Sequence, residues 1–494
     1  MKRISELIKV NDIRQWQRND IITITAGTGT GKSYFIKNIL YAFAKKQNKK
    51  ILMLIHRTNC VNQFREEIIQ DKKTDVIDIQ TYQKLEFKEL HNYEIFLHQY
   101  QYIVCDEFHY FMSDASFNKT TDISLNLILN TNATKIFMSA TGNYVKNYIA
   151  NYKHIETIDY TLPIEYKFNT LTFFNKDTTL EELAKEAIKT KEKIIFFIQS
   201  AKKAYELHLQ FKDYSLFNCS KSNKEYYKKV DKKKISDMLS DEKFEGNMLI
   251  TTTCMDAGIN LIDTDIKHIV VDVKDVGSLI QCIGRKRIQG LNDYVNVYIK
   301  TINNKQLGGT ETQLNKKIEM ADYLRENDVK SFILKYPREY DKSNIVYDDP
   351  VEEDDKGTKK VNEMMYFKCK TDLVNIDIMK QLGDFGYCKY LANLFGFYDE
   401  DTGKYNYRVL EEEKGKDLLI HYLENIKGQK LFKDDKEELK KVFNKAGLKA
   451  RTLGINTLNG WLKDLKINYI IENKMTSKII NSKKKNIRYW IVIE

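Results

Sequence analysis

A stretch near the N-terminus combines glycines, a lysine and a hydroxyl side chain in an order that suits phosphate binding. It reads Ala26-Gly27-Thr28-Gly29-Thr30-Gly31-Lys32-Ser33. Glycines let backbone N–H groups approach an anion because no Cβ intervenes, and a helix that starts there adds partial positive charge. Lys32 can reach the outer phosphates of a nucleotide, and the Ser33 hydroxyl can ligate Mg²⁺. We therefore predict a nucleotide site, in preference to a flexible Gly/Thr turn, that is contacted by Thr28, Gly29, Thr30, Gly31, Lys32 and Ser33.

A second chemical centre is the acidic pair Asp106-Glu107, which follows the apolar run at 102–105. An aspartate at the end of a buried strand can hold a metal ion. The adjacent carboxylate can orient and deprotonate an attacking water. Alone, such a pair usually marks a solvated loop. Because it follows a phosphate-binding pattern, we predict that Asp106 helps to hold Mg²⁺ and that Glu107 is the general base.

The elements that position these groups are predicted from the apolar pattern. Buried strands are expected at residues 21–25, 51–55, 76–79, 102–105 and 136–138, and residues 33–46 have the spacing of an amphipathic helix. Strands alternate with helical stretches, and polar residues follow the C-terminal end of each strand. This alternation predicts a doubly wound α/β sheet with a site along one edge.

Composition limits the class of protein. The 494 residues, with 42% apolar and 30% charged side chains, are typical of a globular chain with several domains. The 7 cysteines are scattered and contain no C-x-x-C pair, which argues against a zinc or iron–sulfur site. No apolar stretch approaches the ~18 residues that span a bilayer, so we expect a cytoplasmic protein without a membrane partner. The net charge of +11 permits a polyanionic partner but does not establish one.

Taken in order, the motifs resemble those of a superfamily 2 helicase of the DExH type. Residues 26–33 resemble motif I, 54–63 motif Ia, 106–109 motif II and 139–141 motif III. The resemblance implies that three residues couple the nucleotide site to nucleic acid, namely His109, Ser139 and Thr141. It also implies that Arg57 and Thr81 contact the phosphate backbone.

Three later stretches extend the resemblance to a second lobe. Residues 193–200 resemble motif IV, 251–260 motif V and 281–287 motif VI. The resemblance implies that Thr252 contacts a nucleic-acid phosphate. It further implies residues that face the nucleotide, namely Gly258, Asn260, Gln281, Arg285 and Arg287. The second arginine of the pattern Q-x-x-G-R-x-x-R falls on Ile288, so which of Arg285 and Arg287 is the arginine finger stays open.

Two departures from the family pattern indicate which subfamily the chain resembles. No G-x-x-x-P-x-x-I-Q element precedes the phosphate-binding stretch, and motif II reads D-E-F-H instead of D-E-A-D. The chain is therefore more similar to DNA-directed DExH members and to phage or mobile-element helicases than to DEAD-box RNA helicases. On this basis we expect nucleic acid as the partner, with DNA favoured over RNA.

The last third of the chain lies outside this resemblance. Six basic residues and no acidic ones occur between Lys474 and Arg488, framed by apolar runs that read as paired strands. Two helical stretches precede them. This order predicts either a winged helix that contacts phosphates through Lys483, Lys484 and Lys485, or a small α+β domain with a solvated basic loop.

Together these features predict an α/β protein with two tandem RecA-like P-loop NTPase domains, at residues 1–160 and 161–305, plus a C-terminal α+β accessory region. That region divides into a helical or linker part at 306–429 and the possible winged helix at 430–494. The expected reaction is Mg²⁺-dependent ATP hydrolysis coupled to translocation or unwinding. A duplex translocase that never separates strands and an ATP-switched nucleic-acid-binding regulator are the alternatives. The sequence does not indicate an oligomeric state.

Overall fold

The fold is given by a computed structural model. It describes residues 3–27, 29–56, 58–116, 118–164, 166–253, 261–290, 293–337, 343–349, 358–447, 450, 453–480 and 483–494. The chain divides into two compact units. One comprises Met1–Thr170 and Leu180–Tyr405, and the other comprises Leu171–Thr179 and Asn406–Glu494.

The first lobe is built on a parallel sheet with the strand order β3-β2-β4-β5-β1-β6. Its strands are β1 (Ile21–Thr25), β2 (Ile51–Ile55), β3 (Ile77–Thr81), β4 (Tyr102–Asp106), β5 (Thr134–Ser139) and β6 (Ile158–Thr161). Strands β1, β2 and β5 are buried along their whole length, because parallel strands covered on both faces are continuous apolar runs. Strand β5 lies between β1 and β4, so the ends of all three strands meet at one edge.

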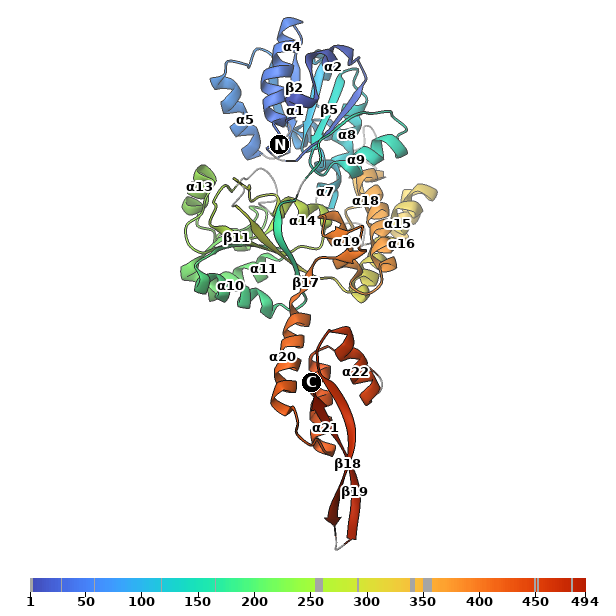
Figure 1. The fold of residues 1–494 in the computed structure, drawn as a ribbon. Coiled ribbons are helices and arrows are strands. Elements are labelled where there is room, and N and C mark those ends of the chain that lie inside the picture. The colour runs from blue at the N-terminus through green and yellow to red at the C-terminus, as the bar shows by residue number, and fades with distance from the viewer. Residues whose placement is uncertain are drawn as a thin grey trace. The chain divides into compact units, whose positions relative to one another are not determined.

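Helices α1 and α2 precede the first strand, and further helices connect the strands of this sheet (Figure 1). They are α1 (Ile4–Leu7), α2 (Val10–Gln15), α3 (Lys32–Tyr34), η1 (Phe35–Leu40), α4 (Tyr41–Lys46), α5 (Thr58–Gln70), α6 (Tyr82–Leu90), η2 (Leu97–Gln99), α7 (Tyr110–Ser113), η3 (Asp114–Ser116), α8 (Thr121–Leu129), α9 (Asn143–Asn147) and η4 (Tyr148–Tyr152). The segments α3, η1 and α4 form one continuous helix with a π-helical middle, since the residues at both junctions are helical. This confirms the helix expected after the phosphate-binding stretch.

The second lobe has a sheet with the order β7-β12-β11-β8-β10-β9. Its strands are β7 (Phe168–Phe174), β8 (Lys193–Ile198), β9 (Ser215–Asn218), β10 (Met248–Thr251), β11 (Ile266–Asp272) and β12 (Val295–Lys300). Its helices are α10 (Thr178–Thr190), α11 (Ala201–Gln210), η5 (Lys212–Tyr214), α12 (Lys224–Tyr227), α13 (Lys232–Asp241) and α14 (Val276–Ile283). Strands β9, β10, β8, β11 and β12 pair in parallel. The two parallel sheets with their connecting helices form two tandem RecA-like domains, as predicted.

A packed helical region follows the second sheet within the same unit. It contains α15 (Asn304–Glu326), α16 (Val329–Lys335), β13 (Val346–Asp349), β14 (Thr358–Val361), α18 (Glu363–Gln381), α19 (Gly386–Leu394), β15 (Tyr398–Asp399) and β16 (Lys404–Tyr405). Helix α18 packs against α15 and α19 and also against α7, α8 and η3 of the first lobe (Figure 1). Helix α18 therefore connects this region to the first lobe, and the division of residues 306–429 made from the sequence stays a prediction.

In the residues of the C-terminal unit that the structure describes, three helices are followed by a long hairpin. Short strand β17 (Arg408–Val409) pairs with Thr172 and Phe173 of β7. Then come α20 (Leu410–Ile426), α21 (Lys433–Lys445), α22 (Ile455–Asp464), β18 (Ile470–Ile480) and β19 (Lys483–Ile493). A core of apolar side chains joins the helices to the hairpin, including Leu423, Leu439, Leu458 and Val492. The basic residues predicted for a loop lie within the paired strands, which are longer than expected. This unit is larger than residues 430–494, and the boundaries proposed from sequence stay predictions.

Among the described residues, no helix combines the length and the apolar character needed to cross a membrane.

Candidate active site

The phosphate-binding loop lies between β1 and α3. Gly29 and Gly31 have positive φ angles of 79° and 87°, a conformation that glycine adopts without strain. Gly31 is the residue immediately before α3, so the loop ends at the start of a helix. The Thr30 hydroxyl donates to the carbonyl of Gly27 at 2.8 Å and closes the loop. The loop is therefore shaped to present backbone N–H groups, as the sequence predicted.

Lys32 lies inside this loop and is buried. Its Nζ donates to the carbonyl oxygens of Ala26 at 2.8 Å and Gly27 at 3.0 Å. Burial lowers the pKa of Lys32, while the charges of Glu107 and Asp106 act in the opposite sense. The ammonium group is thus close to the acidic pair. Ser33, the next residue, is exposed.

The acidic pair follows the end of β4. Asp106 is the last residue of that strand, and Glu107 has a positive φ of 50°. A left-handed conformation is uncommon for glutamate, and such residues concentrate at functional sites. Burial, together with the charge of Glu107, raises the pKa of Asp106 to about 7. Burial also acts to raise the pKa of Glu107, but its hydrogen bond and charge interaction with His109 outweigh burial, and the net shift is downward.

Glu107 belongs to a network with residues of the third motif. His109 Nδ1 lies 3.2 Å from Glu107 Oε2 and 2.8 Å from Ser139 Oγ. The Ser139 hydroxyl donates to Glu107 Oε2 at 3.3 Å and accepts from the backbone N–H of Thr141 at 3.1 Å. Because Ser139 ends β5, the strand beside β4, the sheet itself brings these residues together.

The network continues into the second lobe through Gln281 of α14. Gln281 Nε2 donates to the Thr141 hydroxyl at 2.8 Å. Its Oε1 accepts from an Arg285 amino group at 2.7 Å, and Arg285 Nε donates to the Gln281 carbonyl at 3.0 Å. A continuous series of hydrogen bonds thus connects Glu107 of one RecA-like lobe to Arg285 of the other.

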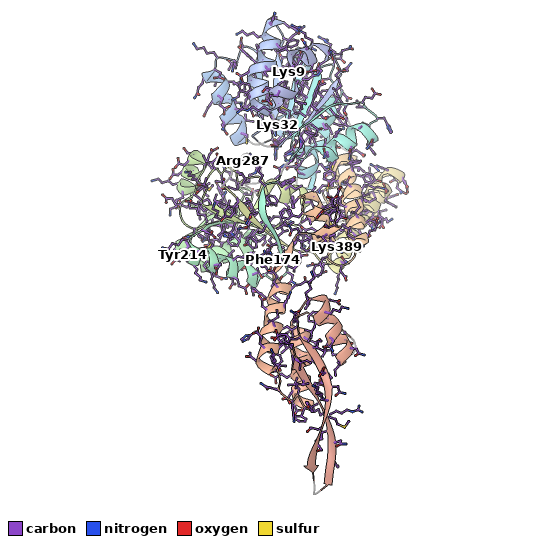
Figure 2. All side chains as sticks on the ribbon, in the orientation of Figure 1. Lys9, Lys32, Phe174, Tyr214, Arg287 and Lys389 are labelled. Carbon is purple, nitrogen blue, oxygen red and sulfur yellow. The ribbon has the colours of Figure 1, made fainter. Side chains whose placement is uncertain are left out.

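The two arginines of the last motif follow the end of α14, where Arg285 lies in a turn and the next residue, Lys286, forms a β-bridge with Leu261. Backbone hydrogen bonds join Arg285 and Arg287 to Leu261. Lys286, which lies between the two arginines, forms a buried ion pair with Asp293 at 2.5 Å. Burial and the charge of Arg285 lower the pKa of Arg287 to about 10, while the charge of Glu107 opposes them. Figure 2 labels Lys32 and Arg287, on facing edges of the two lobes.

Other site residues predicted from the sequence either lie outside the described residues or have other contacts. Thr28, Arg57, Gly258 and Asn260 lie outside the described residues. Thr81 caps α6, where its hydroxyl accepts from the backbone N–H of Lys84 at 3.2 Å. Thr252 follows β10 and is buried. Lys485 is exposed on β19 of the C-terminal unit, and the side chains of Lys483 and Lys484 lie outside the described part of that hairpin.

Sequence reasoning missed two residues that shape the acidic turn, Phe108 and Gly142. A Cβ on Gly142 would lie 2.0 Å from the ring of Phe108, so only glycine fits there. The sequence does contain one indication of this packing, which is a glycine, Gly142, directly after the motif Ser139-Ala140-Thr141. The aromatic ring of motif II therefore packs onto the backbone that follows motif III.

Comparison with known proteins finds one family profile and several solved structures. The profile, described as an AAA domain, matches residues 14–145, which include both the phosphate-binding loop and the acidic pair. Comparison with curated proteins finds no significant match. The match and the loop geometry make the first lobe a P-loop NTPase domain.

The solved structures resemble the chain only distantly. One is S. cerevisiae Dbp5 bound to RNA and ADP BeF3, at 18% identity and TM-score 0.43, covering 58% of this chain and 79% of that one. The DEAD-box helicase Mss116 bound to ssRNA and UDP-BeF has 14% identity and TM-score 0.43, and the match covers 61% of this chain and 69% of that one. Mss116p bound to ssRNA and AMP-PNP has 14% identity and TM-score 0.44, and the match covers 65% of this chain and 79% of that one. The RecA-like assignment rests on this chain's own strand order.

Proposed function

We propose that this chain is a nucleic-acid motor, an ATP hydrolase whose turnover drives movement along DNA or unwinding of it. The observation that carries the proposal is the series of hydrogen bonds from Glu107 to Arg285. It connects a carboxylate suited to activate water with an arginine suited to stabilise charge on the γ-phosphate. Because the series crosses from one lobe to the other, ATP held at Lys32 changes how the lobes contact each other.

The residues at the loop fit Mg²⁺ as the second cofactor. Ser33 is exposed at the start of the helix, and Asp106 ends the neighbouring strand β4. Mg²⁺ usually takes one or two protein ligands and completes its shell with phosphate oxygens and water. When bound, the ion neutralises charge that develops on the phosphate oxygens.

The nucleic-acid side of the proposal rests on the sequence pattern and on charge. Arg57, Thr81 and Thr252 are the proposed phosphate contacts of the two lobes. The C-terminal unit, from Asn406 to Glu494, has 20 Lys and Arg against 12 Asp and Glu, so it carries +8 of the chain's net charge of +11. Three helices followed by a hairpin support a winged helix there. We propose a cytoplasmic protein with DNA as the substrate.

ATPase measurements with single- and double-stranded DNA and RNA test the proposal. We expect turnover that DNA stimulates and that Lys32→Ala abolishes, because this change removes the charge that holds the β- and γ-phosphates. A strand-displacement assay then separates unwinding from translocation alone. Stimulation by RNA but not by DNA would reverse the substrate assignment. Negligible turnover with ATP-dependent DNA binding would indicate an ATP-switched regulator, and near wild-type turnover in Lys32→Ala would remove the loop from the mechanism.

A further inference from the structure

Helix α14 delivers Gln281 and Arg285 to the nucleotide site, so whatever fixes its start also sets where these two side chains lie. The residue before α14 is Asp275, whose Oδ2 accepts from the backbone N–H of Ser278 at 2.8 Å and caps the helix. The cap satisfies an N–H group that the first turn leaves unpaired.

The other oxygen of Asp275 is held by the accessory helical region. Lys368, on α18, donates from Nζ to Asp275 Oδ1 at 2.7 Å and to Asp372 Oδ2 at 2.9 Å. The Lys368 side chain is 12% exposed. Burial acts to raise the pKa of Asp275, but the charge and hydrogen bond of Lys368 outweigh burial, and the pKa falls to about 2. The pair is therefore fully charged at neutral pH.

Helix α18 also contacts the first lobe, close in sequence to Thr141, the residue to which Gln281 donates. Asn375, two turns along α18 from Lys368, donates from Nδ2 to the Tyr144 hydroxyl at 3.1 Å. Tyr144 belongs to α9, which begins two residues after Thr141. Lys368, Asn375, Thr141 and Gln281 all line one cavity of about 390 Å³.

We propose that Lys368 is a positioning residue for ATP hydrolysis: by holding the cap of α14, it places Gln281 and Arg285 against the first lobe. This inference rests on the proposed function and gives the region at 306–429 a role in it. Lys368 touches neither the phosphate-binding loop nor the acidic pair in the described contacts, so it acts through α14. Displacements of about 1 Å at a catalytic group can cost on the order of 100-fold in rate.

The test compares Lys368→Met with Lys380→Met in the full chain. Lys380 lies on the same helix and also forms an ion pair, but its partner is Glu311 of α15, so it controls for loss of a charge from α18. We expect Lys368→Met to lower the kcat for DNA-stimulated ATP hydrolysis about tenfold or more with an unchanged KM for ATP. Lys380→Met should stay within about twofold of wild type. Equal kcat values in the two variants would overturn the proposal.

Asp275→Asn separates positioning from support of the fold. Asparagine caps a helix as well as aspartate does, yet it removes the charge that Lys368 holds. We expect the same loss of kcat in Asp275→Asn, measured at a temperature where the variant remains folded. We expect no further loss when it is combined with Lys368→Met, and partial recovery of kcat when Lys368→Arg replaces Lys368→Met. Full activity of Asp275→Asn would overturn the proposal even if Lys368→Met failed to fold. Absence of turnover in the wild-type chain would refute the proposed function itself, whereas unaffected variants of an active wild type refute only this inference.

Discussion

Gln281 donates a hydrogen bond to the hydroxyl of Thr141 over 2.8 Å, and the two residues belong to different RecA-like lobes. Each has a second partner that leads further into the site. Gln281 also accepts from Arg285, and the Thr141 backbone donates to Ser139, which contacts Glu107. Breaking this one contact therefore separates the carboxylate of one lobe from the arginine of the other without removing either.

We expect Gln281→Ala to lower kcat by about 10- to 100-fold, because a hydrogen bond to a charged group contributes roughly 1.5–3 kcal/mol. Steady-state ATPase assays measure this loss. Thr141→Val removes only the hydroxyl and keeps the bond between Gln281 and Arg285, so its loss should be smaller than that of Gln281→Ala. The double variant should lose little more than Gln281→Ala alone, since both changes break the contact between Gln281 and Thr141. Gln210→Ala, at the exposed last residue of α11, is the control. Fully additive losses would mean that the two residues act independently.

We expect Glu107→Gln to bind ATP with wild-type affinity and to lose about 10²- to 10⁴-fold in hydrolysis, because the general base is removed while Asp106 and Lys32 remain. Glutamine keeps the size of the side chain in its left-handed backbone conformation. A fluorescent nucleotide measures binding, and single-turnover assays measure the chemical step. Loss of ATP binding, or normal hydrolysis, would show that Glu107 is not the base.

The strands and the site edge could be predicted because their signals are local. A strand covered on both faces is a continuous apolar run, and parallel strands place their C-terminal ends along one edge. Asp106, Ser139 and the loop after Thr25 therefore had to meet once β1, β4 and β5 were recognised. The resemblance supplied Gln281 and Arg285, but not the contact between Gln281 and Thr141, which are 140 residues apart.

What could not be predicted depends on tertiary packing. Nothing in the residues around Lys368 indicates that it pairs with Asp275, 93 residues earlier, because an isolated lysine on a helix usually faces solvent. The backbone path through Arg285 and Arg287 could not be predicted either. After the turn that ends α14, this backbone hydrogen-bonds to Leu261 and takes its conformation from that partner.

Asp122 of α8 provides a pH-dependent test of the packing between the first lobe and the accessory region. It is buried, and its Oδ2 accepts from the Tyr347 hydroxyl of β13 at 3.4 Å. Burial, partly offset by nearby backbone N–H groups, raises its pKa from 3.8 to about 7. A carboxyl group with a raised pKa in the fold contributes stability below about pH 4 and loses that contribution as the pH rises through about 7.

Asp122→Asn should therefore be more stable than wild type above pH 7, by up to about 4 kcal/mol, since each unit of pKa shift corresponds to 1.36 kcal/mol. The gain should vanish toward pH 4. Denaturant unfolding of both proteins from pH 4 to 8 measures it. Asp213→Asn, at an exposed site, should show no such trend. A difference that is constant across this range would mean that Asp122 is not protonated on folding.

The last prediction concerns the hairpin of the C-terminal unit, which has no acidic residue between Glu472 and Glu494. Its six basic residues, from Lys474 to Arg488, favour binding of a polyanion such as the DNA backbone. We expect neutralisation of Lys483, Lys484 and Lys485 to weaken binding of duplex DNA and to reduce the slope of log K against log salt by about 2.7, at 0.9 per lost phosphate contact. Neutralising Lys185, Lys189 and Lys191 together removes the same charge from the second lobe and serves as a control.

Turnover at saturating DNA should be unchanged in the hairpin variant, because the hairpin contributes no residue to the hydrogen-bond series from Glu107 to Arg285. An unaltered salt slope would mean that the hairpin is a solvated surface that does not contact DNA. Loss of ATP turnover at saturating DNA would mean that the hairpin stabilises the RecA-like lobes instead of binding DNA.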